Sequence, residues 1–443
     1  MANNPIANMF RIKELRDRIF FTFVVLVVFR LGCVLTIPGI NAQVLVTYFE
    51  DLAKHNKNAF ASYMDFFAGG AFSNFSVFML GVMPYVSTQI ILQLALIIFP
   101  SLKRAAQEDG GQRKVAAWTR IGTVFVCLIQ SLAVTVYAAS IPGAIALENQ
   151  LAFKLLAMLT VTTGAMITIW LGDQITAHGI GNGISMLIFA GIVARLPHAS
   201  IELYHRVQDG LNPVFVIIVL LMFIGIIAFV VYEQSGERKI PVHYAKRVVG
   251  RKMYGGQSTY IPFKINPSGV IPVIFASSFL TFPLQIVQSF GANQNSARWI
   301  VALSAKLNPT GLLYNVLLVL LIIFFAYFYT QVTLNPTEIA KNIRENGGSI
   351  PGIRTDKTEE YMQKVLNRLV LPGSLYLAAI AVLPTIIQNL FGFPQSISML
   401  MGGTSLLILV GVDLDTMSQV EALLKMHHAD GFVKKGKLRS RNL

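Results

Sequence analysis

The chain has 443 residues, of which 54% are hydrophobic and only 13% are charged. Soluble domains carry about twice that share of charge, and the mean hydropathy of +0.59 is too high for a surface exposed to water. This composition excludes a disordered chain and a soluble repeat protein, and blocks of about twenty apolar residues indicate several membrane-spanning helices. Both cysteines, Cys33 and Cys127, lie inside apolar blocks, so no disulfide framework is indicated.

Ten apolar segments are predicted to cross the membrane. The sixth and eighth are the most continuous, whereas the fifth and tenth are short for a span. In chain order the segments are 19–37, 75–99, 115–139, 151–171, 184–197, 213–232, 269–290, 311–330, 369–388 and 397–412. Before the first of them, apolar residues at near-helical spacing between basic residues predict an amphipathic helix on the inner membrane surface, over residues 1–18.

The basic residues fix the orientation of these spans. Loops on one side carry 26 lysines and arginines, and loops on the other side carry 6. Because basic loops stay in the cytoplasm, both termini are predicted to be cytoplasmic. The predicted order is an amphipathic segment at 1–18, an N-terminal half at 19–200, a C-terminal half at 201–413 with basic loops at 233–268 and 331–368, and a basic cytoplasmic tail at 414–443.

The ten spans divide into two halves of five. Because five is odd, the first span of the second half starts on the side of the membrane opposite to that of the first span of the first half. The two halves are therefore predicted to be an inverted repeat. Helix breakers interrupt the second span of each half, at Gly81 and Pro84 and at Pro272 and Pro283, and the fifth span of each half opens with a glycine-rich turn. Such segments point to a central transport path. The alternative is that Gly and Pro are simply common in membrane helices.

Charged groups are almost absent from the predicted spans. Arg30 lies near the outer end of the first span, where snorkelling to the interface is expected. No metalloprotease, nucleophile-elbow or phosphate-loop motif occurs, and the run Gly179–Gly183 is expected to be a tight turn between helices. The sequence therefore predicts no enzyme, no cofactor and no metal site. The alternative function, an ion-coupled secondary transporter of small solutes, requires buried charged groups that the spans lack.

Several separated motifs resemble the SecY family, the central subunit of the bacterial Sec protein-conducting channel. The strongest runs from Asp173 through Gly-Ile-Gly-Asn-Gly to Ser185, and the resemblance extends from about Arg18 to beyond Val420. It implies an all-α polytopic membrane protein with ten transmembrane helices, in two inverted five-helix halves around a central hourglass pore. The implied function is to pass unfolded secretory polypeptides across the membrane and to release hydrophobic segments sideways into the bilayer.

The resemblance also implies a pore ring and a plug. An aliphatic neck fits around an extended chain without hydrogen-bonding to it, and it resists wetting by ions. The matching ring residues are Val82, Val86, Ile188, Ile274 and Ile408; the alternative for each alone is ordinary helix packing. The segment 63–74 resembles the plug, a short helix that blocks the pore from outside, or else a re-entrant segment without motion. Its expected plug residues are Phe66, Phe67, Gly69 and Gly70.

The implied lateral gate lies between spans two and three and spans seven and eight. Polar side chains there are expected to hold the gate through hydrogen bonds between helices, each contributing about 0.6–2 kcal/mol. They are Ser87, Thr88, Gln89, Gln93, Gln130, Ser277 and Ser278.

The basic cytoplasmic loops are expected to be a docking surface. They exceed what the orientation of the spans requires, although enforcing that orientation is the alternative explanation. The expected docking residues are Arg238, Lys239, Lys246, Arg247, Arg251, Lys252 and Arg354. The resemblance implies that these loops bind the SecA ATPase and the ribosome, including ribosomal RNA phosphates. It also implies SecE and SecG subunits, with SecE bracing the two halves, and unfolded preproteins, nascent membrane proteins and the lipid bilayer as further partners.

Overall fold

The computed structural model describes residues 12–41, 43–45, 47–48, 65, 68–139, 141–147, 149–208, 213–244, 247–249, 252–254, 258–291, 306–307, 311–391 and 403–432. Each of the ten predicted spans overlaps one long helix, and the fifth also includes the first residues of α10 (Leu196–Gln208). In chain order the long helices are α2 (Lys13–Gly32), α5 (Met83–Ile98), α7 (Gly111–Ala139), α8 (Gln150–His178), α9 (Gly183–Val193), α11 (Pro213–Ser235), α12 (Ile271–Gly291), α14 (Leu312–Thr333), α16 (Thr358–Phe391) and α18 (Gly403–Phe432).

Three shorter helices adjoin the long ones: α6 (Pro100–Gln107), α10 (Leu196–Gln208) and α15 (Pro336–Glu345). By length and hydropathy, six of the described helical stretches can cross a membrane, and a seventh is added if α5 and α6, which meet at 104°, form one bent span. The chain is therefore a multi-pass membrane protein.

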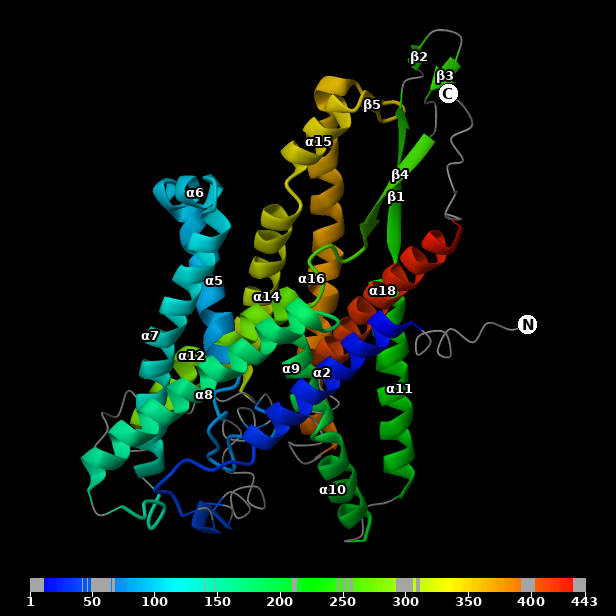
Figure 1. The fold of residues 1–443 in the computed structure, drawn as a ribbon. Coiled ribbons are helices and arrows are strands. Elements are labelled where there is room, and N and C mark those ends of the chain that lie inside the picture. The colour runs from blue at the N-terminus through cyan, green and yellow to red at the C-terminus, as the bar shows by residue number, and fades with distance from the viewer. Residues whose placement is uncertain are drawn as a thin grey trace.

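One hydrophobic core joins the two halves of the helix bundle. It contains buried residues from α2, α5, α7, α8 and α9 and from α12, α14, α16 and α18. Helix α12 packs against α5 and α7 of the other half, and α18 packs against α9. In Figure 1 the helices α6 and α15 lie at the upper end of the bundle and α10 lies at the lower end. The basic loops thus gather at one end, as the charge asymmetry predicts.

The loop between α11 and α12 forms strands, which the sequence pattern did not predict. Strands β1 (Glu237–Tyr244) and β4 (Ser258–Lys264) pair antiparallel with Ile240 opposite Ile261, and β5 (Gly348–Ser349) adds to β1. Strands β2 (Arg247–Val249) and β3 (Lys252–Tyr254) form a second hairpin at the tip of the first (Figure 1).

These strands build a second, smaller core at the same end of the molecule. Alternate residues of β1, Ile240 and Val242, turn inward and pack with residues of α15 and the first turns of α16. Helix α16 is continuous between the two cores, since Met362 lies in the small core and Leu377 lies in the large one. The described parts of the two basic loops, 233–268 and 331–368, are therefore largely packed around this small core, and these loops are called the basic body below.

Two predicted boundaries at the N-terminal end are wrong. Residues 13–18 are the first turns of α2 and do not form a separate surface helix. Leu15, on the apolar face of these turns, is buried against Ile180 and Val420, so protein covers this face. The second span is helical only from Met83. The chain before it forms turns, and the backbone around Phe75 hydrogen-bonds to residues 35 and 37 instead of to its own helix.

Two later boundaries also differ. Pro197 does not end the fifth span but lies in the first turn of α10. Proline is tolerated there because N–H groups in the first turn of a helix have no acceptor within the helix. Helix α10 therefore continues through residues 200 and 201, the predicted boundary between the halves. At the other end α18 continues to Phe432, so the first part of the predicted tail is helical.

Candidate functional site

The five predicted ring residues come from four helices of both halves. Val82 precedes α5 and accepts a hydrogen bond at 3.2 Å from the N–H of Val86, so the two share one turn. Ile188 lies on α9, Ile274 on α12 and Ile408 on α18. Four of the five are buried, and Ile274 is half-buried against the same central core. All five side chains therefore belong to, or pack against, the central core that joins the two halves.

A cavity of about 250 Å³ adjoins this cluster. Ile274 and Ile408 form part of its wall, while polar groups from α9 and from the turn before α12 form another part, including Asn182, Ser185 and Asn266. Lys264 and Asp415 also line it, with Lys264 Nζ 3.7 Å from Asp415 Oδ1. The cavity therefore has both polar and aliphatic walls, and it lies between α9, α12 and α18.

Within the predicted plug segment 63–74, Asp65 is helical and residues 68–74 form turns. Residues 68–82 lack helical hydrogen bonding, and Gly69 and Gly70 have positive φ values of 64° and 93°. Phe72 and Phe75 are buried in the central core. Two further predicted plug residues, Phe66 and Phe67, lie outside the described residues.

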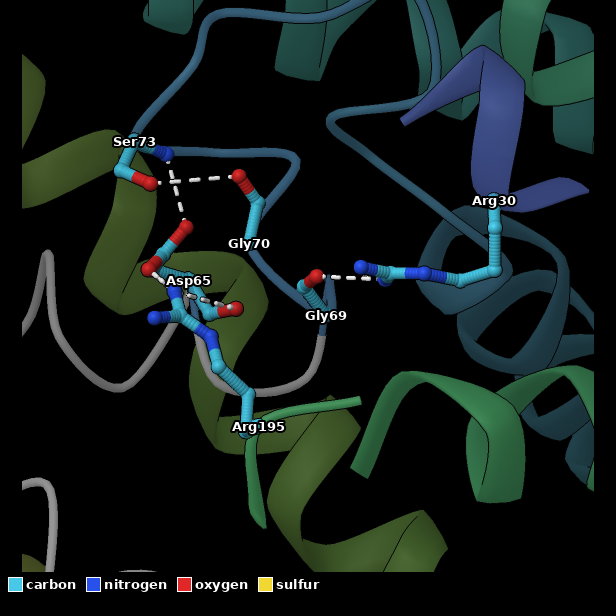
Figure 2. Close-up of polar contacts among 6 residues, drawn as sticks. All are labelled: Arg30, Asp65, Gly69, Gly70, Ser73 and Arg195. Atoms are coloured by element: carbon cyan, nitrogen blue, oxygen red, sulfur yellow. Dashed lines mark hydrogen bonds and ion pairs between the residues drawn. The ribbon is translucent and has the colours of Figure 1, made fainter. Parts of the chain in front are cut away.

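Two arginines hold this segment from different sides (Figure 2). Arg30 of α2 donates from Nη1 to the carbonyl oxygen of Gly69 at 2.7 Å. Arg195, which follows α9, forms an ion pair with Asp65. The expectation that Arg30 snorkels to the interface is therefore wrong, because its guanidinium binds protein. Sequence reasoning missed Asp65 and Arg195, whose partners are distant in the chain.

The helices expected to form the lateral gate are in contact, but most of their hydroxyl groups do not form the expected hydrogen bonds between helices. Ser87 donates to the carbonyl of Met83 at 3.0 Å and Thr88 to that of Pro84 at 2.8 Å, both within α5. Ser277 likewise donates to the carbonyl of Ile274 at 3.0 Å. These hydroxyls therefore hydrogen-bond to carbonyl groups of their own helices, as Ser and Thr side chains commonly do, and not to side chains across the gate.

One predicted gate residue does bridge the two halves. Ser278 Oγ of α12 lies 3.5 Å from Met83 Sδ of α5, and both side chains are buried. Gln89 is half-buried on α5. The Oε1 atoms of Gln93 and Gln130 are buried and accept no hydrogen bond from the part of the chain that is described. Among the described residues, the contact between α5 and α12 thus relies mainly on packing. Met83 takes part in it, although reasoning from hydrogen-bonding side chains did not predict this residue.

The glycine-rich run of the strongest motif is a tight turn between α8 and α9, as predicted. Asn182 caps α9, since its Oδ1 accepts from the N–H groups of Ile184 and Ser185 at 3.1 and 3.3 Å. The N–H of Gly181 donates to Gln419 Oε1 of α18 at 2.9 Å, which links the two halves. The turn therefore acts as a polar junction inside the bundle.

Gly183 packs so closely that a side chain has no room. A Cβ placed there would lie 1.8 Å from the carbonyl oxygen of Gly172 on α8. We expect Gly183→Ala to lower the free energy of unfolding by about 1–3 kcal/mol, as overpacking does, and to lower the thermal midpoint of the detergent-purified protein. Gly225→Ala is the control, because nothing lies within 4 Å of its Cβ position. Equal midpoints for the two variants would contradict this packing.

The predicted docking residues lie on the basic body. Arg238 and Lys239 are exposed on β1, and Lys239 Nζ lies 4.7 Å from the ring centroid of Tyr260. Arg354 is exposed on the turn before α16, 3.7 Å from Asp356. Arg247 and Lys252 belong to the β2–β3 hairpin, whereas Lys246 and Arg251 lie outside the described residues.

Comparison with known proteins identifies this arrangement. A model of the SecY family matches residues 76–417. The chain belongs to the SecY family. It is 44% identical over 421 residues to the protein translocase subunit SecY of Borreliella burgdorferi, covering 94% of each chain. A solved structure of a protein conducting channel superposes with a TM-score of 0.65 at 17% identity, covering 95% of each chain.

The SecY-type fold extends to a more distant structure. Sec61 in the canine ribosome–channel complex from the endoplasmic reticulum superposes with a TM-score of 0.59 at 16% identity, covering 95% of each chain. Membership of the SecY family confirms the predicted fold class and the prediction that the chain is a translocase channel subunit and not an enzyme. The alternative of an ion-coupled transporter receives no support.

Proposed function

We propose that the chain passes unfolded secretory polypeptides through the junction of its two halves and releases hydrophobic segments sideways. The observation that carries this proposal is that Val82, Val86, Ile188 and Ile408, from both halves, are all buried in the central core, with Ile408 also lining a cavity of mixed polar and apolar character. An aliphatic neck binds no particular sequence, because its side chains form no hydrogen bonds with a passing backbone. It also excludes a continuous column of water.

Translocation by the reconstituted chain tests this function. The purified protein is placed in lipid vesicles together with its accessory subunits and a SecA-type ATPase, and a preprotein is added outside. We expect ATP-dependent protection of the preprotein from added protease. Equal protection in vesicles that lack the chain would contradict the proposal.

The segment 63–74 is proposed to be the plug. Its residue Phe72 is buried in the same core as the ring, and its turns are tied to both α2 and the end of α9. The lateral gate is proposed to lie where α12 meets α5 and α7, which is one of the places where helices of opposite halves pack together; another is α18 against α9. The buried contact of Ser278 with Met83 supports that location.

The basic body is proposed to bind SecA and the ribosome. Its exposed cations on β1 and before α16 project from one end of the bundle, and guanidinium and ammonium groups suit both RNA phosphates and acidic protein surfaces. The gathering of basic loops at this end also supports a cytoplasmic (inner) membrane location with both termini in the cytoplasm.

Charge reversal on the basic body should impair secretion. We expect Arg251→Glu, Lys252→Glu and Arg354→Glu to weaken binding of SecA and ribosomes, by about 1 kcal/mol for each ion pair that is removed, without lowering the amount of channel in the membrane. Lys306→Glu is the control, because Lys306 is exposed in the loop before α14, away from the proposed surface. Co-sedimentation with ribosomes and a SecA binding assay measure the effect. Normal binding by all three variants would contradict docking here.

SecE and SecG are proposed as the accessory subunits. A groove of about 550 Å³ crosses from one half to the other and is lined mainly by apolar side chains of α2 and α18, such as Phe23, Leu26, Leu414 and Met417. An apolar groove of this kind suits a membrane helix of another subunit, which supports SecE as a brace across the two halves.

A further inference from the structure

The turn from Asp65 to Ser73 is held by charges that the helix bundle supplies. Asp65 Oδ1 accepts from the N–H of Ser73 at 2.7 Å, and the Asp65 carbonyl accepts from the N–H of Gly70 at 2.9 Å. The same carboxylate forms the ion pair with Arg195, whose Nη2 also lies 3.4 Å from the Asp65 carbonyl oxygen. Asp65 therefore shapes the turn and ties it to the bundle at once (Figure 2).

A second tie lies a few residues further along the turn. The hydrogen bond from Arg30 reaches the carbonyl of Gly69, and a Cβ placed on Gly69 would lie 2.7 Å from Cα of Gly191 on α9. The turn thus rests directly on the α9 backbone, with one arginine on either side of it. Only a residue without a side chain fits at this approach.

The ion pair is well shielded from solvent. The side chains of Arg195 and Asp65 are 22% and 12% exposed. Among the described residues, Arg30 repels Arg195 and Glu202 attracts it. Removing the Asp65 charge therefore takes away the ion-pair partner of Arg195 and leaves the attraction of Glu202 to offset the like charge of Arg30, in a place where water screens charges poorly.

We propose that Asp65, Arg195 and Arg30 form an electrostatic latch that positions the 65–73 turn in the closed channel and sets how readily it is displaced. The inference rests on the proposed role of this segment as the plug. Asp65 and Arg195 are positioning residues, because they hold the turn without forming the aliphatic neck. An arriving polypeptide has to break this ion pair before the turn can leave α9.

Accessibility of Ala68 tests the latch without relying on translocation. Ala68 is 6% exposed, and both native cysteines, Cys33 and Cys127, are buried and can be replaced by Ala. In that background Ala68→Cys reports release of the turn through its rate of labelling by a membrane-impermeant maleimide. We expect Asp65→Asn to raise this rate about tenfold, since Asn keeps the acceptor for Ser73 and loses only the charge.

Exchanging the charges of Asp65 and Arg195 distinguishes loss of the ion pair from general misfolding. Asp65→Arg and Arg195→Asp should each speed labelling, and the two together should label more slowly than either alone, because the pair is restored with reversed polarity. Arg120→Met is the matched control, since it breaks the exposed Arg120–Asp173 pair of 2.9 Å elsewhere in the bundle and should leave the rate unchanged.

Resting ion conductance of the same variants separates the latch from the plug. Faster labelling together with higher conductance supports both. Faster labelling with unchanged conductance would support the latch and contradict the plug role. Parental labelling rates in Asp65→Asn and Arg195→Asp, or an exchange variant that labels as fast as the single variants, would overturn the latch.

Discussion

Replacing Val86 and Ile408 together by serine opens the resting channel to ions. Both side chains are buried in the central core, at 4% and 1% exposure, and they approach it from opposite halves of the molecule. Two hydroxyls and the smaller side-chain volume let water span the neck, and each 1.4 kcal/mol removed from the wetting barrier raises conductance about tenfold. We therefore expect an increase of at least about tenfold in planar bilayers.

The same double variant should also export preproteins with weak signal sequences. The closed state loses packing that the open state never had, so the balance shifts toward opening. Val24→Ser and Ile224→Ser are the controls, because both residues are apolar, lie on α2 and α11, and are exposed on the outside of the bundle. Equal conductance in the ring and control variants would show that the constriction lies elsewhere.

Tying α5 to α12 should stop the channel from opening sideways. Met83 and Ser278 provide the contact, since their side chains meet at 3.5 Å across the two halves. In a cysteine-free background, Met83→Cys and Ser278→Cys bridged by a short thiol-reactive reagent are expected to reduce insertion of membrane proteins to about a tenth. Lateral exit requires these helices to separate, and a covalent bridge prevents it.

A matched pair within one half controls for the chemistry. Thr385 Oγ1 of α16 donates to Asn315 Oδ1 of α14 at 3.2 Å, and both helices belong to the second half. Bridging cysteines at these two positions should leave insertion intact, because the halves remain free to part. Insertion that continues with Met83 and Ser278 bridged would place the exit between other helices.

Hydropathy and helix breakers predicted the membrane architecture well. Each apolar segment overlaps a helix, and Gly81 and Pro84 mark the place where the second span becomes helical. The turn around Asn182 was also predictable, because its cap and glycines act over only a few residues. Local chemistry of this kind can be read directly from the sequence.

Contacts between distant segments were not predictable in the same way. Arg195 and Asp65 are 130 positions apart, and nothing in the sequence near either residue indicates the other. The strands of the basic body were missed for a similar reason, since β1 alternates inward and outward only against α15 and α16. For the gate hydroxyls, a distant contact was predicted where a local one forms. Ser87 and Thr88 were expected to bond across the gate, but each donates to a carbonyl of its own helix.

The continuity of α16 has a mechanical consequence. Pro372 and Gly373 lie between the part of this helix in the small core and the part in the large one. Proline removes the main-chain hydrogen bond to the carbonyl of residue 368, so bending stiffness is lowest there. From that pivot to Thr358 is about 20 Å of helix, and a rocking of about 5° moves the far end by roughly 2 Å. If a partner binds the basic body as proposed, a few degrees of its motion can therefore be taken up at this pivot.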